Sequence, residues 1–199
     1  MPGRFSEDAE SNWKRGLSAM NLNEYEKEYF SIYEAFAETV RFILEKALLT
    51  ADDLPLPQSI QCRAKGVISL RKRLTEAGRL DTQTLELDRR DLAGTRLIFY
   101  TNNDVDRFLA SSLIRENFEI EEASTKIHHP TSENKEARYR AIHYTVLLCE
   151  DRIRLPEYAR FAGLRCEIQV QTILNHACPK PPMTFSIKTS WVMVTVGKP

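Results

Sequence analysis

The sequence lacks the features that mark membrane-spanning, secreted and zinc-binding proteins. No apolar run approaches the roughly 20 residues of a membrane-spanning helix, and the N-terminal residues contain no apolar signal core. The four cysteines are not spaced closely enough for a zinc site. The net charge is zero, so bulk charge gives no argument for binding nucleic acid. We therefore expect a cytoplasmic protein with no membrane partner, in which any anion site is built by local clustering.

The composition is that of an ordinary soluble globular protein. Hydrophobic residues make up 42% and charged residues 28% of the 199 positions. This length suffices for one sizeable domain, or for one domain with a helical extension. Cys149 and Cys166 lie inside apolar strand patterns, which predicts small buried thiols.

Residues 164–172 alternate between apolar and polar side chains, which predicts a strand with one buried face. The apolar face carries Leu164, Cys166, Ile168 and Val170, and the polar face carries Arg165, Glu167, Gln169 and Gln171. A carboxylate between an arginine and two glutamines does not suit a dry core. The polar face is therefore either solvated or the floor of a polar site.

Helices and strands alternate along the rest of the chain. Residues 23–49 carry aromatic and aliphatic side chains at steps of three and four, which predicts one long amphipathic helix packed on the core. Pro55 and Pro57 end it. Further strands are expected at 59–65, 95–100, 118–126 and 139–148, helices at 67–78 and 105–115, and a turn or short helix at 155–161. The fold class is therefore α/β (α+β), with a mixed β-sheet flanked by helices.

Basic residues concentrate between positions 63 and 79. They are Arg63, Lys65, Arg71, Lys72, Arg73 and Arg79. In a chain with no net charge, such a group is either the solvated face of a helix or a cradle for a polyphosphate. The residues by themselves leave both interpretations open.

Two acids also stand out. Asp91 lies just before a predicted strand, close to Gly94 and Arg96, and Glu167 lies in mid-strand among polar neighbours. Two carboxylates on adjacent strands can hold Mg²⁺ beside a phosphate, because that ion prefers oxygen ligands and keeps several waters. Phosphoryl-type transfer needs little beyond positioning, a metal and positive charge. Solvated carboxylates at strand ends are the alternative.

Four short motifs follow one another along the chain: Arg63-x-Lys65-x-x-x-Ser69-x-x-x-Arg73, Asp91-x-x-Gly94-x-Arg96, Tyr139-x-x-x-His143 and Glu167-Ile168-Gln169-Val170-Gln171-Thr172. In this order they resemble the motifs of the RelA/SpoT alarmone synthetase domain, over roughly residues 59–177. The resemblance implies a fold like that of the nucleotidyltransferases. It also implies transfer of the β,γ-diphosphate of ATP to the 3′-hydroxyl of GDP or GTP, which gives (p)ppGpp, with Mg²⁺ as cofactor.

The resemblance also assigns the residues that bind ATP. Arg63 and Arg96 match the arginines that sandwich the adenine, a use suited to planar guanidinium groups. Lys65 and Ser69 match the cradle of the ATP phosphates. Arg73 stands where the family usually has lysine, and the charge is kept.

The remaining assignments concern the metal and the acceptor nucleotide. Asp91 matches the Mg²⁺ ligand, and Glu167 matches the acid that binds metal and helps to activate the 3′-hydroxyl. Tyr139 matches the ring that stacks on guanine, Lys135 the basic residue before it, and His143 the family's histidine on the same strand.

The chain departs from the family's pattern in three places. Ala137 and Arg138 replace an Asn-Gly pair, and Gln171 replaces an arginine. The histidine-rich hydrolase domain of bifunctional members has no counterpart, because no histidine precedes His128. The chain thus resembles a small, single-domain synthetase.

The predicted domain organisation has three parts: an N-terminal helical extension at 1–57, a synthetase-like domain at 58–177, and an aberrant tail at 178–199. The family continues after residue 177 with a helix, which the prolines at 179, 181 and 182 forbid. Residues 178–188 can be back-translated with chosen codons that, after one G is added to codon 178, encode Trp-Ser-Glu-Thr-Ala-His-Asp-Ile-Phe-Tyr-Lys, the family pattern, so the tail is compatible with a one-base deletion. We therefore expect the tail to be out of frame, with loss of a helix that activity requires.

The leading interpretation is thus a GTP/GDP diphosphokinase, whose partners are ATP and GDP or GTP. One alternative is a toxin-like pyrophosphokinase acting on the tRNA 3′ end, and another is a non-catalytic nucleotide-binding remnant. The helix at 23–49 serves either as a packed lid or as a surface for oligomer formation.

Overall fold

The computed structural model describes residues 20–128, 141–174 and 192–194. A mixed sheet of seven strands forms its centre, with the order β3-β5-β6-β2-β1-β7 and with β4 paired to β5 outside that path. The strands are β1 (Ser59–Ala64), β2 (Ala93–Phe99), β3 (Phe118–Ile120), β4 (Lys126–His128), β5 (Ala141–Leu148), β6 (Cys166–Thr172) and β7 (Val192–Val194). β2 and β6 run parallel, and the other pairs are antiparallel. The predicted fold class is confirmed.

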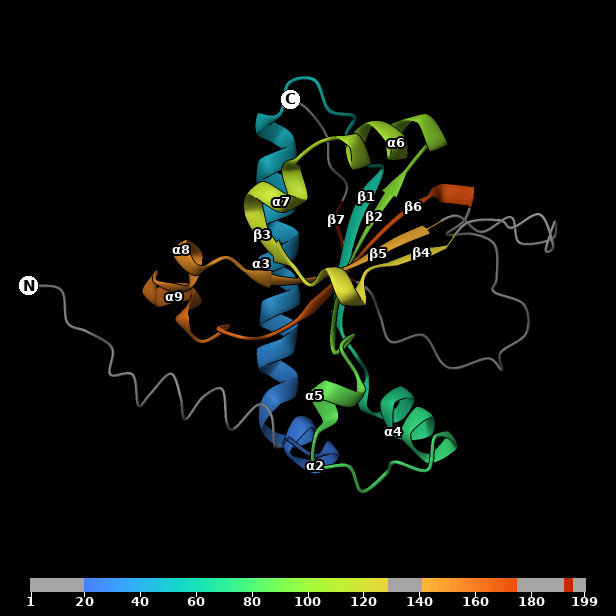
Figure 1. The fold of residues 1–199 in the computed structure, drawn as a ribbon, viewed down its shortest axis with the longest axis vertical. Helices are drawn as coiled ribbons and strands as arrows, with labels where there is room; N and C mark the ends of the chain where they lie inside the picture. The colour runs from blue at the N-terminus through green and yellow to red at the C-terminus, as the bar shows by residue number, and fades with distance from the viewer. Residues whose placement is uncertain (1–19, 129–140, 175–191, 195–199) are drawn as a thin grey trace, which may run out of the picture.

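Helices and helical turns surround this sheet (Figure 1). They are α2 (Leu22–Glu24), the π-helical segment η1 (Tyr25–Tyr29), α3 (Phe30–Thr50), α4 (Val67–Glu76), α5 (Leu85–Asp88), α6 (Asn102–Ala110), α7 (Leu113–Asn117), the 3₁₀ turn η2 (Glu122–Ser124), α8 (Glu150–Ile153) and α9 (Pro156–Ala159). Figure 1 shows α2, α4 and α5 gathered at one end of the molecule and α6 and α7 towards the other. No helix in the described ranges is both long and apolar enough to cross a membrane.

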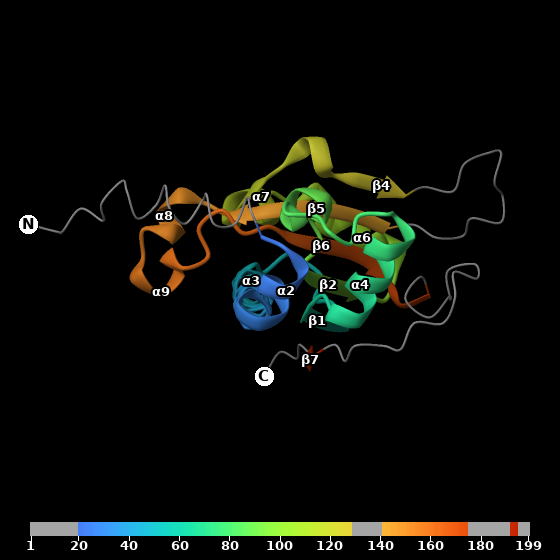
Figure 2. The same ribbon diagram turned by 90° about the horizontal axis from the view of Figure 1, so that it is seen from below.

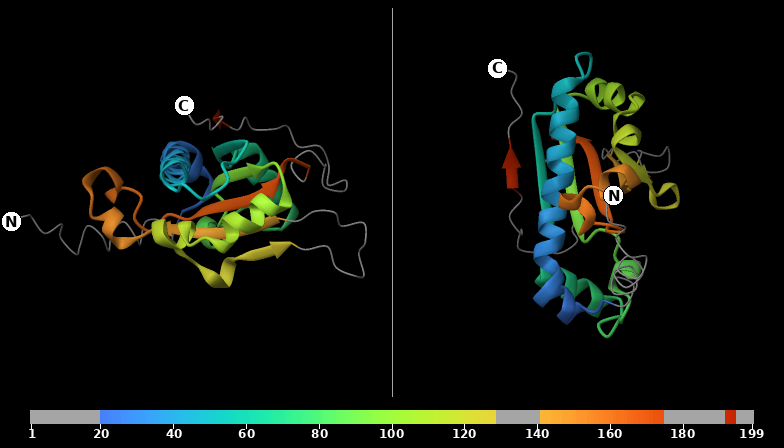
Figure 3. Two further views of the ribbon diagram at one scale, coloured as in Figure 1. Left: turned by 90° about the horizontal axis from the view of Figure 1, so that it is seen from above. Right: turned by 90° about the vertical axis from the view of Figure 1, so that its left-hand side faces the viewer.

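The long helix predicted at 23–49 is confirmed, as α2, η1 and α3 in succession. It begins at a capping box, in which the Asn21 side chain accepts hydrogen bonds from the backbone of Asn23 and Glu24, and the Glu24 carboxylate accepts one from the backbone of Asn21. Its aromatic stripe is buried, with Tyr33 and Phe36 fully covered. Figure 3 shows α3 running along the length of the sheet, where it contacts β1, β2 and β6. This helix covers one face of the sheet and leaves the other face to the polar residues.

The alternating pattern at 164–172 sets those two faces. Cys166, Ile168 and Val170 of β6 are fully buried on the side of α3. Phe36 of α3 packs against Phe161, with 5.4 Å between ring centroids. Cys166 is a buried free thiol, as predicted, whereas Cys149 is only partly buried.

Two predicted elements are each divided in the structure. The helix expected at 105–115 is two helices, α6 and α7, because the backbone is extended at Ser111. The Ser111 hydroxyl donates a hydrogen bond to the carbonyl of Phe108 at 2.6 Å. The strand expected at 118–126 is β3 and β4, each antiparallel to β5, with η2 between them. Helix α8, before α9, was not predicted.

The tail is described only at β7, which pairs antiparallel with β1 through Ile60 opposite Val194. Figure 2 shows β7 at the outer edge of the sheet, beside β1. The frame shift expected from residue 178 onward stays a prediction.

Replacement of Phe36 by alanine tests the docking of α3. Loss of a fully buried ring in contact with Phe161 should reduce the free energy of unfolding by about 3–5 kcal/mol. Phe42, on the same helix, is 47% exposed, and its replacement should change stability by less than about 1 kcal/mol. Urea unfolding measures both, and equal losses would contradict the packing described.

Candidate active site

The motif residues meet on the polar face of the sheet because strand register aligns them. One row across β1, β2, β6 and β5 consists of Arg63, Gly94, Glu167 and Thr145. The next row consists of Gln61, Arg96, Gln169, His143 and, on β4, Lys126. Directly paired residues point to the same face of a sheet. Four motifs that are far apart in sequence therefore share one surface.

Glu167 is held in this surface by two neighbours. Its Oε1 lies 3.2 Å from Nδ1 of His143, and the Gln169 amide donates a hydrogen bond to its Oε2. Gln169 in turn accepts two hydrogen bonds from Arg96, from Nε at 3.0 Å and from Nη2 at 2.9 Å. The Glu167 side chain is only 15% exposed, so the polar face of β6 is the floor of a polar site and not a solvated surface.

The same contacts fix the charge of Glu167. Burial raises the pKa of its carboxyl, but the hydrogen bond and charge of His143, the Gln169 amide and the charge of Lys126 outweigh burial and hold the pKa at about 2. Glu167 is therefore ionised at neutral pH, ready to bind a cation or to accept a hydrogen bond.

Asp91 lies in the loop before β2 and is paired with cations. Lys65 Nζ forms an ion pair with its Oδ2, and Arg73 Nη1 lies 4.0 Å from the same oxygen. Lys65 is itself buried, which lowers the pKa of its amine, while the charge of Asp91 opposes that shift. The backbone of Lys65 is fixed at both of its polar groups. Its N–H donates to Leu92 O and its carbonyl accepts from Tyr25 Oη, each at 2.8 Å. Asp91 thus meets a cation whose place is set by the core.

Arg63 and Arg96 lie on the same face of neighbouring strands. Burial, and then the charge of Arg96, lower the pKa of the Arg63 guanidinium to about 10. Two guanidinium groups that repel each other in a partly buried site favour a ligand that is anionic or aromatic.

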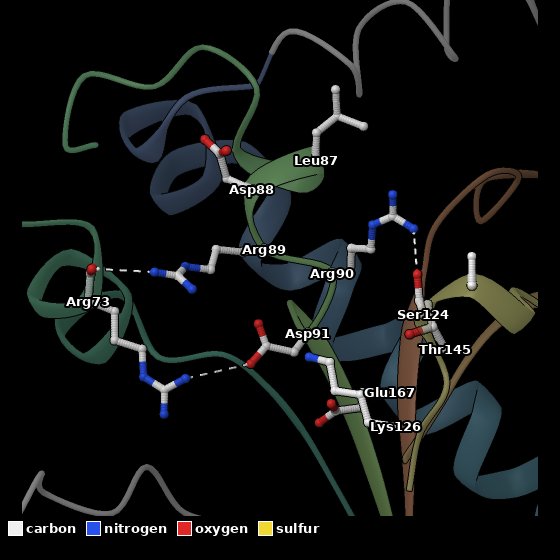
Figure 4. A pocket seen from close by; sticks show the side chains of 11 residues that line it. Arg73, Leu87, Asp88, Arg89, Arg90, Asp91, Ser124, Lys126, Thr145 and Glu167 are labelled. Atoms are coloured by element: carbon white, nitrogen blue, oxygen red, sulfur yellow. Dashed lines mark hydrogen bonds and ion pairs between the residues drawn. The ribbon is translucent and has the colours of Figure 1, made fainter. Parts of the chain in front are cut away.

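A pocket of about 340 Å³ opens beside Asp91 and Glu167 (Figure 4), and Arg63 and Arg96 are not among the residues that line it. Its lining residues are Arg73, Leu87, Asp88, Arg89, Arg90, Asp91, Ala123, Ser124, Lys126, Thr145 and Glu167. The carboxylate of Asp91 reaches it from the loop before β2 and that of Glu167 from β6, and four cationic side chains surround them. A pocket of this size and polarity suits a small, highly charged ligand.

Three of those cations, Arg89, Arg90 and Lys126, were not predicted from the sequence as site residues. Arg90 donates to Ser124 Oγ at 2.6 Å and forms an ion pair with Glu121. Arg89 donates to the backbone oxygen of Arg73 at 3.4 Å, and its Nε is buried without a hydrogen-bond partner among the described residues. The available signal was the Asp-Arg-Arg-Asp run at 88–91, which lies beyond the basic segment that was considered.

The basic segment at 63–79 divides between the two interpretations. Lys65 is buried and Arg73 lines the pocket, as expected of a phosphate cradle. Arg71 and Lys72 are exposed and pair with exposed acids, whereas Arg79 is exposed but pairs with Asp88, a mostly buried acid that lines the pocket. Ser69 is partly buried in the first turn of α4, one helical turn before Arg73, and Lys65 precedes that helix. Tyr139 and Lys135 lie outside the described residues, so their predicted roles stay predictions.

Asp91 and Glu167 are also suited to a divalent cation. No cluster of three or more acidic, histidine or cysteine side chains that could hold a metal occurs in the described part of the chain. Mg²⁺ needs no such cluster, since it is commonly held by one or two carboxylates, substrate phosphates and water. Both carboxylates line one pocket, and both act on the charge of Lys65. The donor set therefore fits Mg²⁺ bound together with a phosphate ligand.

Comparison with solved structures identifies the fold. The small alarmone synthetase 1 from Bacillus subtilis is 18% identical, with a TM-score of 0.59, over 77% of this chain and 74% of that chain. The small alarmone synthetase 2 from Bacillus subtilis is 19% identical, with a TM-score of 0.57, over 75% of this chain and 73% of that chain. A GTP pyrophosphokinase family protein from Streptococcus pneumoniae is 21% identical, with a TM-score of 0.53, over 77% of this chain and 70% of that chain.

Comparison with family models gives the classification. No curated protein matches the chain significantly. The family described as "Region found in RelA / SpoT proteins" matches residues 62–183, which include β1, β2, β5 and β6 and the pocket between them. Since this match spans more than half of the sequence, the chain belongs to the RelA/SpoT family.

Proposed function

We propose that this protein is a Mg²⁺-dependent diphosphotransferase, which moves the β,γ-diphosphate of ATP to the 3′-hydroxyl of GDP or GTP and so makes (p)ppGpp. The observation that carries the proposal is the pocket lined by Asp91, from the loop before β2, and Glu167, from β6, amid four cationic side chains. The fold adds support, because the small alarmone synthetase 1 from Bacillus subtilis has been solved bound to its product pppGpp and, separately, to AMPCPP.

In this proposal ATP lies across β1, β2 and α4. Arg63 and Arg96 hold the adenine between planar guanidinium groups. Lys65, Ser69 and Arg73 bind the phosphates, with Lys65 exchanging part of its ion pair with Asp91 for a phosphate oxygen. Arg89 adds a further charged donor, since its Nε has no partner among the described residues.

Glu167 prepares the acceptor. Its carboxylate is ionised and accepts a hydrogen bond from the 3′-hydroxyl. His143 and Gln169 fix the orientation of the carboxylate for this contact. The hydroxyl oxygen bonds to the β-phosphorus of ATP as its proton passes to Glu167. The bond between that phosphorus and the α–β bridging oxygen breaks, and AMP leaves with the electron pair. Asp91 and Glu167 would hold Mg²⁺, which would neutralise charge on the phosphates.

The acceptor's guanine is assigned to Tyr139 for stacking and to Lys135 and His143 for polar contacts. Transfer to the 3′ end of tRNA, or binding without transfer, would use the same ATP site. Incubation with γ-labelled ATP, Mg²⁺ and either GDP, GTP or tRNA distinguishes them. Labelled guanosine tetra- or pentaphosphate is the expected product. Labelled tRNA, or ATP binding with no product, would contradict the proposal.

Removal of either acid should abolish transfer. Glu167→Gln and Asp91→Asn remove the charges that bind the cation and accept the proton, so kcat should fall at least about a hundredfold. Glu119→Gln, on the exposed edge strand β3, is the control and should keep full activity. Initial rates with GDP and labelled ATP measure all three variants, and a Glu167→Gln enzyme of normal kcat would rule out the assignment.

The low pKa of Glu167 also predicts how stability depends on pH. Folding lowers this pKa from about 4.5 to about 2, so the stabilisation is complete above pH 4.5 and disappears as the pH falls towards 2. This shift contributes on the order of 3 kcal/mol to the free energy of unfolding at neutral pH. Urea midpoints between pH 6 and pH 2.5 should therefore fall less steeply for Glu167→Gln than for the wild type, and parallel curves would refute the shift.

We further propose that residues 178–199 are out of frame. The nucleotide sequence at codon 178 checks this directly, since a single-base insertion there should restore a family-like continuation. The chain with the restored frame should exceed the present one in kcat by at least about tenfold, because it regains a helix that packs on the sheet. A DNA sequence that admits no such insertion would end this proposal.

A further inference from the structure

Four charged side chains form a ring beside the pocket, in the order Glu86, Arg165, Glu121, Arg90. Arg165 Nη1 lies 3.8 Å from Glu86 Oε1, and Arg165 Nε donates to Glu121 Oε1 at 3.2 Å. Glu121 Oε2 pairs with Arg90 and accepts a hydrogen bond from Ser124 Oγ at 2.6 Å. The chain from residue 86 to residue 90 closes the ring, and Figure 4 shows the Arg90–Ser124 contact at the edge of the pocket.

This ring touches both segments that carry the proposed catalytic acids. Arg90 immediately precedes Asp91, and Arg165 lies two residues before Glu167. Glu121 joins the two arginines through one carboxylate, with a separate oxygen for each. Its own position is fixed, because Glu121 N donates to Thr145 O at 2.9 Å, and Thr145 is the β5 partner of Glu167.

Burial distinguishes this ring from surface ion pairs. The Glu86 side chain is 5% exposed, those of Arg165 and Glu121 are 23% and 22% exposed, and that of Arg90 is 39% exposed. Charges that are partly withdrawn from water hold their partners more firmly than exposed ones. Glu122, the next residue, provides the contrast. It pairs with Arg115, and the side chains of Glu122 and Arg115 are 60% and 64% exposed.

We propose that Glu121 is a positioning residue for diphosphate transfer, which holds Asp91 and Glu167 at a fixed separation by binding Arg90 and Arg165 together. This inference rests on the proposed function. Glu121 does not line the pocket in the described structure, so it acts through the two acids and not on the nucleotides. Small displacements between groups that must share one cation and one phosphate reduce the rate strongly.

The kinetic test compares two neighbouring substitutions. Glu121→Gln keeps the shape but loses the charge, and kcat per folded molecule should fall by about 10- to 100-fold while KM for ATP changes by less than about threefold. Glu122→Gln removes the exposed charge next to it and should leave both constants unchanged. Arg165→Gln in the Glu121→Gln background should add little, because the shared contact is already lost. A role in stability alone would lower the melting temperature and leave kcat per folded molecule intact.

A second measurement does not depend on activity. Amide hydrogen exchange should become faster in Glu121→Gln at residues 89–95 and 164–168, and not in Glu122→Gln. If the wild type transfers no diphosphate, the proposed function fails, and the exchange data still decide whether Glu121 joins the two segments. Unchanged exchange would overturn the inference, and so would faster exchange with a normal kcat in an active enzyme.

Discussion

The parallel pairing of β2 with β6 is the constraint on which the site depends. It sets Gly94 opposite Glu167 and Arg96 opposite Gln169, so this register aligns the β2 motif with the β6 motif on one face. A shift by one residue would send Glu167 to the face that α3 covers, where a carboxylate could not remain charged without a partner. The apolar alternation of β6, packed against α3, excludes that shift. The core therefore fixes the chemistry through a single strand pair.

Within that register, charge and space are matched locally. Asp91 is paired with Lys65, and Glu167 is bonded to His143 and, through Gln169, linked to Arg96. Gly94 lies in the row between Arg63 and Glu167 and adds no side chain, which leaves room above β2 for a ligand. Such pairs keep both signs of charge in place before the ligand arrives.

The sequence predicted the parts of this arrangement that have a short-range signature. Periodicity predicted the long helix and the faces of β6, and the motifs predicted that Asp91 and Glu167 would lie close together, as they do in the lining of the pocket. The sequence could not predict the break at Ser111, since the pattern of apolar residues continues across it, and it could not predict that Arg89 lines the pocket. The contacts of Glu121 with Arg90 and Arg165 were also out of reach, because these residues are 31 and 44 positions apart and carry no joint pattern.

Those long-range contacts matter most for Asp91. Glu167 lies inside β6 and is held by ladder hydrogen bonds, whereas β2 begins only at Ala93, two residues after Asp91. The backbone ladder therefore does not fix the position of Asp91 relative to Glu167. Side chains must do so, together with the backbone hydrogen bond from Lys65 N to Leu92 O. The described side chains that reach this loop are Lys65 and Arg73, which pair with Asp91, and Ser124 and Glu121, which bind Arg90. Since Lys65 and Arg73 must also bind ATP in the proposed reaction, the contacts of Arg90 are the ones that can persist throughout a turnover.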